Sequence, residues 1–252
     1  MAEFVLTPNL PKCANIVLIG EKYADKLEIP LKNQGISPIF IPNNPLVDPR
    51  LASHADLSVF YAGGKRIYLA PFLQNADFIK KLNDLGAETV LADIKQTPQY
   101  PHDAGLNIAV IGNSIIYNPK VSYKSAVDFL TIDYKYRAIP CKQGYAKCSV
   151  LVVNERSLIT EDRGIADSAT AAGLDVLEIT PGYVLLDGFT HGFIGGAGFK
   201  LNSGELAFTG TLDLHPDKQR ILDFLSARNI TPAYLTSEPI FDIGSAITLT
   251  EK

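Results

Sequence analysis

A histidine and an aspartate stand two residues apart early in the chain, in the segment His54-Ala-Asp56. Side chains at this spacing lie on one face of a β-strand. An imidazole beside a carboxylate is a common pair for general acid–base chemistry. The sequence therefore makes His54 a candidate catalytic residue and Asp56 a candidate ligand-binding residue. A place in a surface loop is the alternative for His54.

A second histidine, His191, precedes a glycine-rich run that contains Gly195 and Gly196. Glycines let a backbone approach a ligand closely, or relieve crowding where several segments meet. The run lacks the spacing and the following helix of a dinucleotide-binding fingerprint. We expect His191 to be catalytic and the two glycines to lie at the ligand, with crowding as the alternative for the glycines.

Three cysteines, Cys13, Cys141 and Cys148, occur without a CxxC pair. An odd number of scattered thiols fits reduced cysteines in the cytoplasm better than a disulfide scaffold. Cys148 begins a predicted strand, as Asp56 does, and is therefore a candidate catalytic nucleophile. A small thiol buried in the core is the other interpretation.

Near the C-terminus, Asp242 and Ser245 begin the last predicted strand and are candidate ligand-binding residues. Asp242 and Asp56 hold equivalent positions, so the two carboxylates could bind a cation together, or each could cap a turn. No His, Cys and carboxylate set has metal-ligand spacing along the chain, so we expect no metal and no other cofactor. Convergence of His54, Asp56, His191 and Asp242 on a metal is the alternative.

The elements that must position these residues recur along the chain. A predicted hairpin, a helix and a further strand follow one another about every 40–50 residues. The hairpins begin near His54, Leu106, Cys148, Gly192 and Asp242. The last one ends with the chain, and a strand, helix and strand within residues 15–41 complete it.

This repeat predicts an α/β fold of five pseudo-symmetric ββαβ units. We expect a five-bladed propeller that is closed by the N- and C-terminal strands and forms a single domain over residues 1–252. Closure of this kind hides sheet edges that would otherwise be exposed. An ordinary α/β sandwich with hairpins that are alike by chance is the alternative.

The composition is typical of a globular protein with a sizeable core, with 46% hydrophobic and 20% charged residues. The net charge is -4 and no basic run occurs, so we expect no nucleic-acid partner. No apolar run approaches the ~20 residues that span a bilayer, and the start of the chain lacks a signal-peptide pattern. We therefore expect a cytoplasmic protein without membrane contact, and the sequence does not indicate its oligomeric state.

The repeat and four short motifs resemble the pentein fold, which is the fold of the guanidino-group-modifying enzymes. More narrowly, the chain is similar to an uncharacterised bacterial family of that fold. The motifs are His54-Ala-Asp56-Leu-Ser-Val-Phe60, Thr160-Glu-Asp162, His191-Gly-Phe-Ile-Gly-Gly196 and Asp242-Ile-Gly-Ser-Ala246. The resemblance implies a functional site at the centre of the ring.

Pentein enzymes include arginine and agmatine deiminases, dimethylarginine hydrolases and amidinotransferases. They attack a guanidinium carbon with a cysteine thiolate, assisted by a histidine and by carboxylates that hold the cation. Their cysteine lies close to the C-terminus, where this chain has Ser245 and no cysteine after Cys148. A hydroxyl is a weaker nucleophile than a thiol unless a base activates it.

Three functions follow from these observations. The leading hypothesis is that the protein binds a small cationic ligand, such as a guanidino compound, in an acidic central channel. One alternative is an enzyme that resembles the hydrolases and amidinotransferases but has a displaced nucleophile. The other is a non-catalytic module that binds a protein or ribonucleoprotein, since a translation initiation factor also resembles this fold. The sequence leaves open whether the protein is an enzyme.

Overall fold

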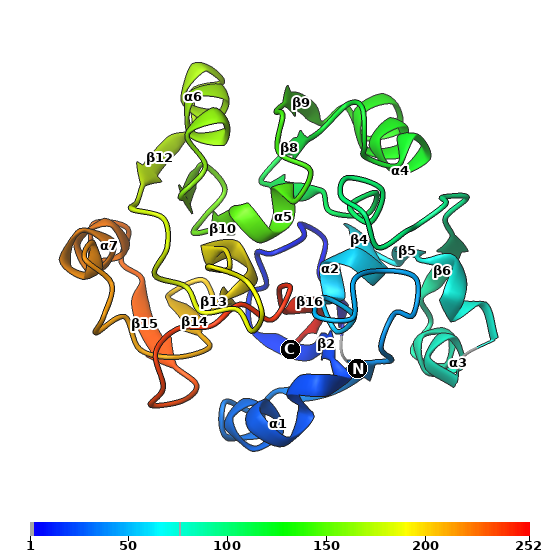
Figure 1. Cartoon of the computed structure of the whole chain (residues 1–252), viewed down its shortest axis with the longest axis horizontal. Coiled ribbons are helices and arrows are strands. Elements are labelled where there is room, and N and C mark those ends of the chain that lie inside the picture. Colours follow the sequence, from blue (N-terminus) through cyan, green and yellow to red (C-terminus); the bar gives the residue numbers. More distant parts are fainter. Residues whose placement is uncertain (1–2, 76) are drawn as a thin grey trace.

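The computed structural model describes residues 3–75 and 77–252. Within this part of the chain the strands form five small sheets, and longer helices lie outside them (Figure 1). The expected mixed α/β class is confirmed. Ala76, which falls in the helix that the repeat predicts after the hairpin near His54, and the first two residues lie outside the described part. No helix of the described residues is both long enough and apolar enough to cross a membrane.

Four of the sheets share one three-stranded pattern, in which an antiparallel hairpin is followed by a parallel strand. The connection to the parallel strand contains a helix in each case, as parallel pairing requires. The first two of these sheets are β4 (Val59–Gly63), β5 (Arg66–Leu69) and β6 (Glu88–Leu91), then β7 (Ala109–Ile111), β8 (Ser114–Tyr117) and β9 (Arg137–Pro140). The other two are β10 (Leu151–Val152), β11 (Ser157–Thr160) and β12 (Asp175–Glu178), then β13 (Gly198–Asn202), β14 (Glu205–Phe208) and β15 (Thr231–Tyr234).

The remaining sheet joins the two ends of the chain. Its strands are β1 (Glu3–Phe4), β16 (Ile247–Glu251), β2 (Ala14–Gly20) and β3 (Ser37–Ile41), in that spatial order. The C-terminal strand β16 is antiparallel to both β1 and β2, and Thr248 lies opposite Val17. The expected pairing of the terminal strands is therefore present.

The longer helices lie at the periphery in Figure 1, whereas two short helices and one short 3-10 turn lie nearer the centre. The peripheral helices are α1 (Ala24–Asn33), α3 (Asp77–Asp84), α4 (Lys124–Asp128), α6 (Arg163–Ala171) and α7 (Lys218–Ser226). A 3-10 turn precedes α1 (Glu21–Tyr23) and another precedes α3 (Pro71–Asn75), and a π-helical turn follows α4 (Phe129–Asp133). The short central elements are α2 (Ala55–Ser58), α5 (Ala146–Ser149) and the 3-10 turn Ile194–Gly196.

The five larger hydrophobic clusters of the described residues each join two neighbouring sheets. In β2, Val17 and Ile19 pack with Phe199 of β13, whereas Leu18 packs with Ile67 of β5. Alternate strand residues point to opposite faces, so a sheet between two neighbours is buried on both sides. The other clusters lie between β4–β5 and β7–β8, between β7–β8 and β10–β11, and between β10–β11 and β14. This burial explains the nearly continuous apolar runs in the hairpins.

The hairpin strands begin later than the sequence predicts. Asp56 and Cys148 were expected at strand starts, but they lie in the helical turns α2 and α5. The reason is that these central segments satisfy their backbone groups with one another rather than in a ladder. The Asp56 N–H donates to the Gly244 carbonyl at 3.0 Å, and the Ser245 N–H donates to the Gly196 carbonyl at 3.2 Å. The expectation that His54 and Asp56 share a strand face is therefore wrong.

Candidate functional site

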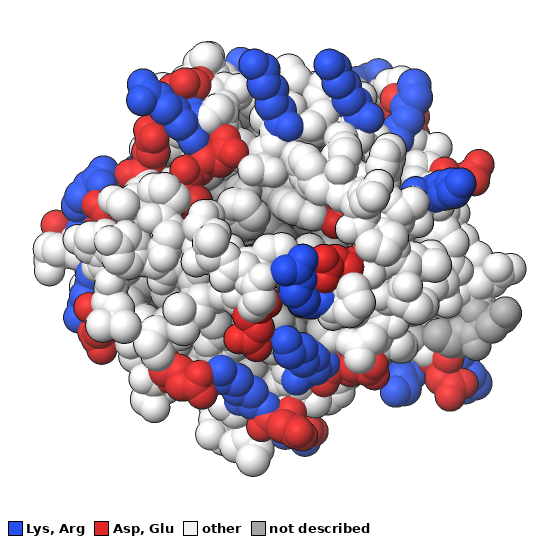
Figure 2. Space-filling model, viewed as in Figure 1, with Lys and Arg blue, Asp and Glu red and all other residues white. Residues whose placement is uncertain are grey.

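Four of the predicted site residues line one cavity of about 250 Å³. They are His54, Cys148, His191 and Asp242. The other lining residues are mostly apolar or aromatic: Leu51, Tyr145, Leu186, Phe189, Thr190 and Phe193. A hollow near the middle of one face of the molecule, bordered largely by uncharged residues, is visible in Figure 2. The fold thus brings together polar side chains that are far apart in the sequence.

Asp56 and Ser245 do not line this cavity but lie behind Cys148, which does. The Cys148 thiol donates a hydrogen bond to Asp56 Oδ2 at 2.8 Å. The Ser245 hydroxyl donates to the same oxygen at 2.7 Å. All three side chains are buried, and Asp56 Oδ1 has no partner among the described residues. Burial raises the pKa of the Asp56 carboxyl. Burial, with the nearby Asp56 and Asp242 carboxylates, holds the pKa of the Cys148 thiol well above its usual value.

His54 lies against the same pair. One of its ring nitrogens, a carboxylate oxygen of Asp56 and Cys148 Sγ all lie within 4.8 Å of one another. Its Nε2 is buried and has no hydrogen-bond partner in the described structure. The backbone of Gly244, at φ +66°, lies directly against His54. Only glycine fits there, because a Cβ would stand 2.3 Å from His54 Cα. The structure therefore groups an imidazole, a carboxylate and a thiol.

Two further residues, which the sequence did not single out, contribute to the surroundings of the thiol. Lys147 is buried, and its Nζ donates to Ser245 Oγ at 3.2 Å. Burial lowers the pKa of its ammonium group. The Asn107 amide oxygen accepts from the backbone N–H groups of Lys147 (2.6 Å) and Cys148 (3.2 Å) and so holds the α5 turn. The only sign of these residues in the sequence is that a lysine stands directly before the candidate cysteine.

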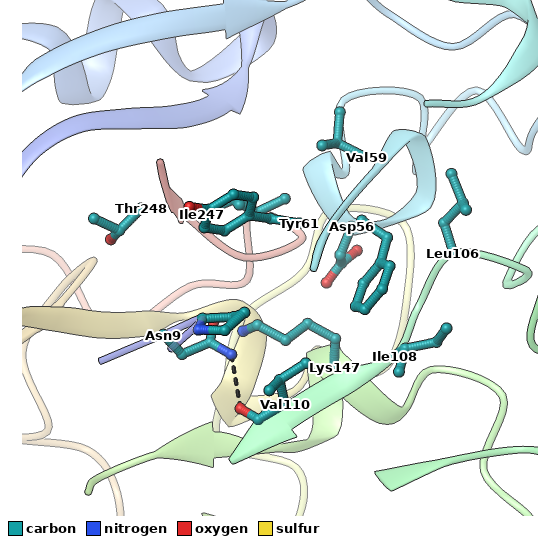
Figure 3. A pocket seen from close by; sticks show the side chains of 12 residues that line it. Asn9, Asp56, Val59, Tyr61, Leu106, Ile108, Val110, Lys147, Ile247 and Thr248 are labelled. Carbon is teal, nitrogen blue, oxygen red and sulfur yellow. Dashed lines mark hydrogen bonds between the residues drawn. The ribbon is translucent and has the colours of Figure 1, made fainter. Parts of the chain in front are cut away.

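A second, much smaller cavity is lined by Asp56. It has about 20 Å³ and is shown in Figure 3, where Asp56 and Lys147 stand among mainly apolar residues. Asn9 lines it too and donates to the Val110 carbonyl at 2.9 Å. A volume near that of a single water cannot hold an organic ligand. The smaller cavity, which Asp56 lines, is therefore not the place for such a ligand, and Asp56 is not among the residues that line the larger one.

Asp242 is oriented by backbone donors. Its Oδ2 accepts from Phe193 N–H at 2.9 Å and its Oδ1 from Gly244 N–H at 2.7 Å. A Cβ at Gly196 would lie 1.9 Å from Asp242 Oδ1, and a Cβ at Gly195 would lie 2.5 Å from the Lys147 carbonyl. Neither Gly195 nor Gly196 is among the residues that line the 250 Å³ cavity. In this structure they make room for the carboxylate and for α5.

The mouth of the cavity is aromatic. The half-buried His191 places its Nδ1 3.0 Å from the Gly192 carbonyl and its ring edge-on to Phe193. Tyr145 packs at an angle to Phe193, and its hydroxyl donates to Asp103 at 2.5 Å. Such rings can cover the flat face of a planar cation.

Glu161 lies beside this group. Its Oε1 accepts from Ile194 N–H at 2.9 Å, and its Oε2 has no partner in the described part of the chain. Burial raises the pKa of the Glu161 carboxyl to about 8. The sequence motif that contains Glu161 supports the fold, but it did not single out this carboxyl for the site.

Together these groups can hold a cation and carry out thiol chemistry. Without a ligand, the surrounding carboxylates and burial keep Cys148 protonated. A positive charge bound in the cavity would lower the pKa of the thiol and favour the thiolate, which is the reactive form. A bound cation would therefore make the Cys148 thiol more reactive.

Comparison with solved structures shows the same fold in guanidino-modifying enzymes. The amidinotransferase SxtG from the saxitoxin pathway of Microseira wollei matches with a TM-score of 0.57 and 11% identity, over 95% of this chain and 96% of that chain. Inosamine-phosphate amidinotransferase of Streptomyces griseus gives 0.58 and 12% identity, over 99% and 97% of the two chains. Agmatine deiminase of C. jejuni gives 0.55 and 9%, over 93% and 90%.

These likenesses confirm the resemblance to the pentein fold, and at such low identity they show the fold alone. No curated protein matches the chain. A family model does match, over residues 18–247, and its description is a family of unknown function, DUF6873. Since the match spans most of the sequence, the chain belongs to the DUF6873 family.

Proposed function

We propose that this protein is a five-bladed pentein-type propeller that binds a small planar cation of the guanidinium type in the 250 Å³ cavity. The ring arrangement is supported by the hydrophobic clusters that join each sheet to its neighbours and by the pairing of β16 with β2. In such a ring the central turns face one another. The cavity lined by them is then the place where a ligand meets residues from several repeats.

The observation that carries the proposal is that Asp242, Cys148 and His54 line one cavity. A guanidinium is planar, cationic and rich in donors, and it pairs with carboxylates through charge-assisted hydrogen bonds. Asp242 supplies the negative charge, and the aromatic rings of Tyr145 and Phe193 supply flat faces at the mouth. The cavity volume suits a small ligand rather than a polymer.

The same cavity favours a displaced nucleophile as the chemistry of the site. The Cys148 proton would pass to His54, and the sulfur would then bond to the guanidinium carbon. An amine would leave with the proton from the imidazolium. The oxygen of a water molecule would then bond to the carbon as the carbon–sulfur bond breaks. One proton of the water would restore the thiol, and the other would leave with the departing amine as its ammonium ion, which gives a neutral ureido product. Cys148 would replace the C-terminal cysteine because α5 places its Sγ in the cavity, within 4.8 Å of a His54 ring nitrogen.

Binding is tested by thermal shift and calorimetry with arginine, agmatine, creatine and methylated arginines. A ligand at 100 times its dissociation constant stabilises the native state by about 2.7 kcal/mol. We expect one of these cations to stabilise the protein and its neutral counterpart, citrulline for arginine, to have no effect. Asp242→Asn should abolish the shift, whereas the exposed Asp223→Asn should retain it. Absence of a shift with every cation at millimolar concentration would contradict the proposal.

The nucleophile is tested with two alkylating probes of similar shape, 2-chloroacetamidine, which is a planar cation, and neutral chloroacetamide. In both, sulfur displaces chloride. If the cavity recruits a cation and activates the thiol, Cys148 is labelled faster by the amidine than by the amide, as followed by peptide mass spectrometry. Cys141, which is buried elsewhere, is the internal control and should show no such preference. If both probes label Cys148 at the same rate, the proposed role of the thiol is wrong. Ligand binding would then still be decided by the thermal-shift and calorimetry experiments.

A further inference from the structure

We infer that His54, Asp56 and Cys148 form a binding site for a divalent metal ion of the zinc class, which goes beyond the proposed binding of an organic cation. The three potential ligand atoms lie within 4.8 Å of one another, and all three residues are buried. In a tetrahedral zinc site, ligands at 2.0–2.3 Å from the metal stand about 3.5 Å apart. Coordination would therefore need only a small rearrangement of the side chains, in which the 2.8 Å contact between Cys148 Sγ and Asp56 Oδ2 opens to about 3.5 Å.

Two of these residues carry buried atoms that nothing in the described structure uses. His54 Nε2 and Asp56 Oδ1 have no hydrogen-bond partner there. Both residues are almost completely buried, with 3% of His54 and 1% of Asp56 exposed, so bulk water does not reach these atoms. Buried polar atoms without partners are uncommon in folded proteins and call for an explanation, such as a bound ion. A metal ion would accept a lone pair from each ligand residue, and unsatisfied atoms at two of the three point to such a site.

The remaining contacts of the cluster are of the kind that orient metal ligands. Ser245 Oγ donates to Asp56 Oδ2 at 2.7 Å, and Asn107 Nδ2 stands 3.8 Å from Cys148 Sγ. Donors of this sort hold a carboxylate or thiolate in position and tune its affinity for the metal. On binding, the Cys148 thiol would lose its proton to solvent, and the metal would replace the hydrogen bond between Cys148 and Asp56.

The protein would supply three ligands and leave one position open. His54 and Cys148 line the 250 Å³ cavity, so a water molecule or a substrate atom could reach the metal from that side. One nitrogen, one oxygen and one sulfur ligand suit zinc or cobalt rather than magnesium or calcium. The alternative set that the sequence allowed included His191 and Asp242, but among the described residues the potential ligand atoms that converge are those of His54, Asp56 and Cys148.

This site escapes a search for ligand spacing because its members come from two repeats. Asp56 lies in the α2 turn and His54 is its N-cap residue, whereas Cys148 lies in the α5 turn. The metal and the organic cation would compete for Cys148. A metal-loaded protein should therefore resist 2-chloroacetamidine, and a chelator should restore labelling.

The test uses the full chain, freed of metal with a chelator and then titrated with Co²⁺ and Zn²⁺. We expect one equivalent of Co²⁺ to bind with a thiolate-to-cobalt absorption band in the near ultraviolet, and Zn²⁺ to displace it. Ser245→Ala should weaken Zn²⁺ binding about 10–100-fold by removing the donor to Asp56. Cys148→Ser should remove the band.

The double variant Cys13→Ser/Cys141→Ser is the matched control, because it keeps Cys148 as the sole thiol. The band must persist in this variant, and this result stands even where Cys148→Ser fails to fold. Absence of stoichiometric Co²⁺ binding to the wild-type chain, or loss of the band in the double variant, would overturn the proposal. Guanidinium binding is measured separately in the presence of chelator, so failure of one proposal leaves the other standing.

Discussion

Replacement of Gly196 by alanine tests whether the crowding around Asp242 is essential to the fold. The new Cβ would stand 1.9 Å from Asp242 Oδ1 and 2.5 Å from its Cγ. Contacts become ordinary at 3.4 Å, so the carboxylate or the Gly196 backbone must move from 1.9 Å to 3.4 Å, by about 1.5 Å. A shift of that size breaks the hydrogen bonds from Phe193 N–H and Gly244 N–H to Asp242.

The magnitude follows from those two bonds. A hydrogen bond to a charged group contributes about 1.5–3 kcal/mol, and overpacking alone costs about 1–3 kcal/mol. We therefore expect Gly196→Ala to lower the free energy of unfolding by about 3 kcal/mol or more. Urea unfolding followed by far-ultraviolet circular dichroism measures this, since the chain has no tryptophan for fluorescence.

A matched control is available in the same type of substitution. At Gly204 a Cβ would meet nothing closer than 3.6 Å, and the residue does not have a positive φ. Gly204→Ala should therefore leave stability unchanged or raise it by up to about 1 kcal/mol. Surface substitutions usually change the free energy of unfolding by up to about 0.5 kcal/mol. If the free energy of unfolding of Gly196→Ala lies within that range of the wild-type value, the account of how Asp242 is held is refuted.

Three further predictions concern pH, thiol reactivity and the terminal sheet. The pKa of Glu161 is raised from 4.5 to about 8, so the folded state keeps a proton that the unfolded chain loses. Stability should accordingly fall by about 3–5 kcal/mol as the pH rises from 4.5 through 8, and Glu161→Gln should flatten that slope in urea unfolding curves. Cys13 is exposed, whereas Cys148 is buried with a raised pKa, so a thiol reagent at neutral pH should modify Cys13 first; faster labelling of Cys148 in peptide maps would contradict its described environment. Leu249 of β16 is fully buried, and Leu249→Ala should cost about 2–5 kcal/mol in thermal unfolding; a smaller loss would show that the strand joining the two ends adds little.

Much of the secondary structure was predictable because local pattern decided it. The strand, helix and strand expected within residues 15–41 correspond to β2 (Ala14–Gly20), α1 (Ala24–Asn33) and β3 (Ser37–Ile41). Helical spacing of apolar residues and short apolar runs with turn residues between them are properties of short segments. The starts of the central hairpins were misplaced for the opposite reason. There the backbone bonds to turns from other repeats, as Asp56 does to Gly244, and no local pattern carries that information.

The candidate site was predictable as a set of residues but not as an arrangement. The repeat placed Asp56, Cys148 and Asp242 at equivalent positions, and four of the predicted residues do line one cavity. Lys147 was missed because buried lysines are rare, and the residues next to it in the sequence do not predict that its side chain is buried.

The sequence by itself determined the class of fold, the order of its elements and the identity of the polar residues that repeat near each hairpin. Only the tertiary structure decided which of them touch. The Cys148 thiol meets the Asp56 carboxylate although the two are 92 positions apart. Apolar runs in the sequence mark which segments become buried strands, whereas the contact between two turns depends on how all the sheets pack together.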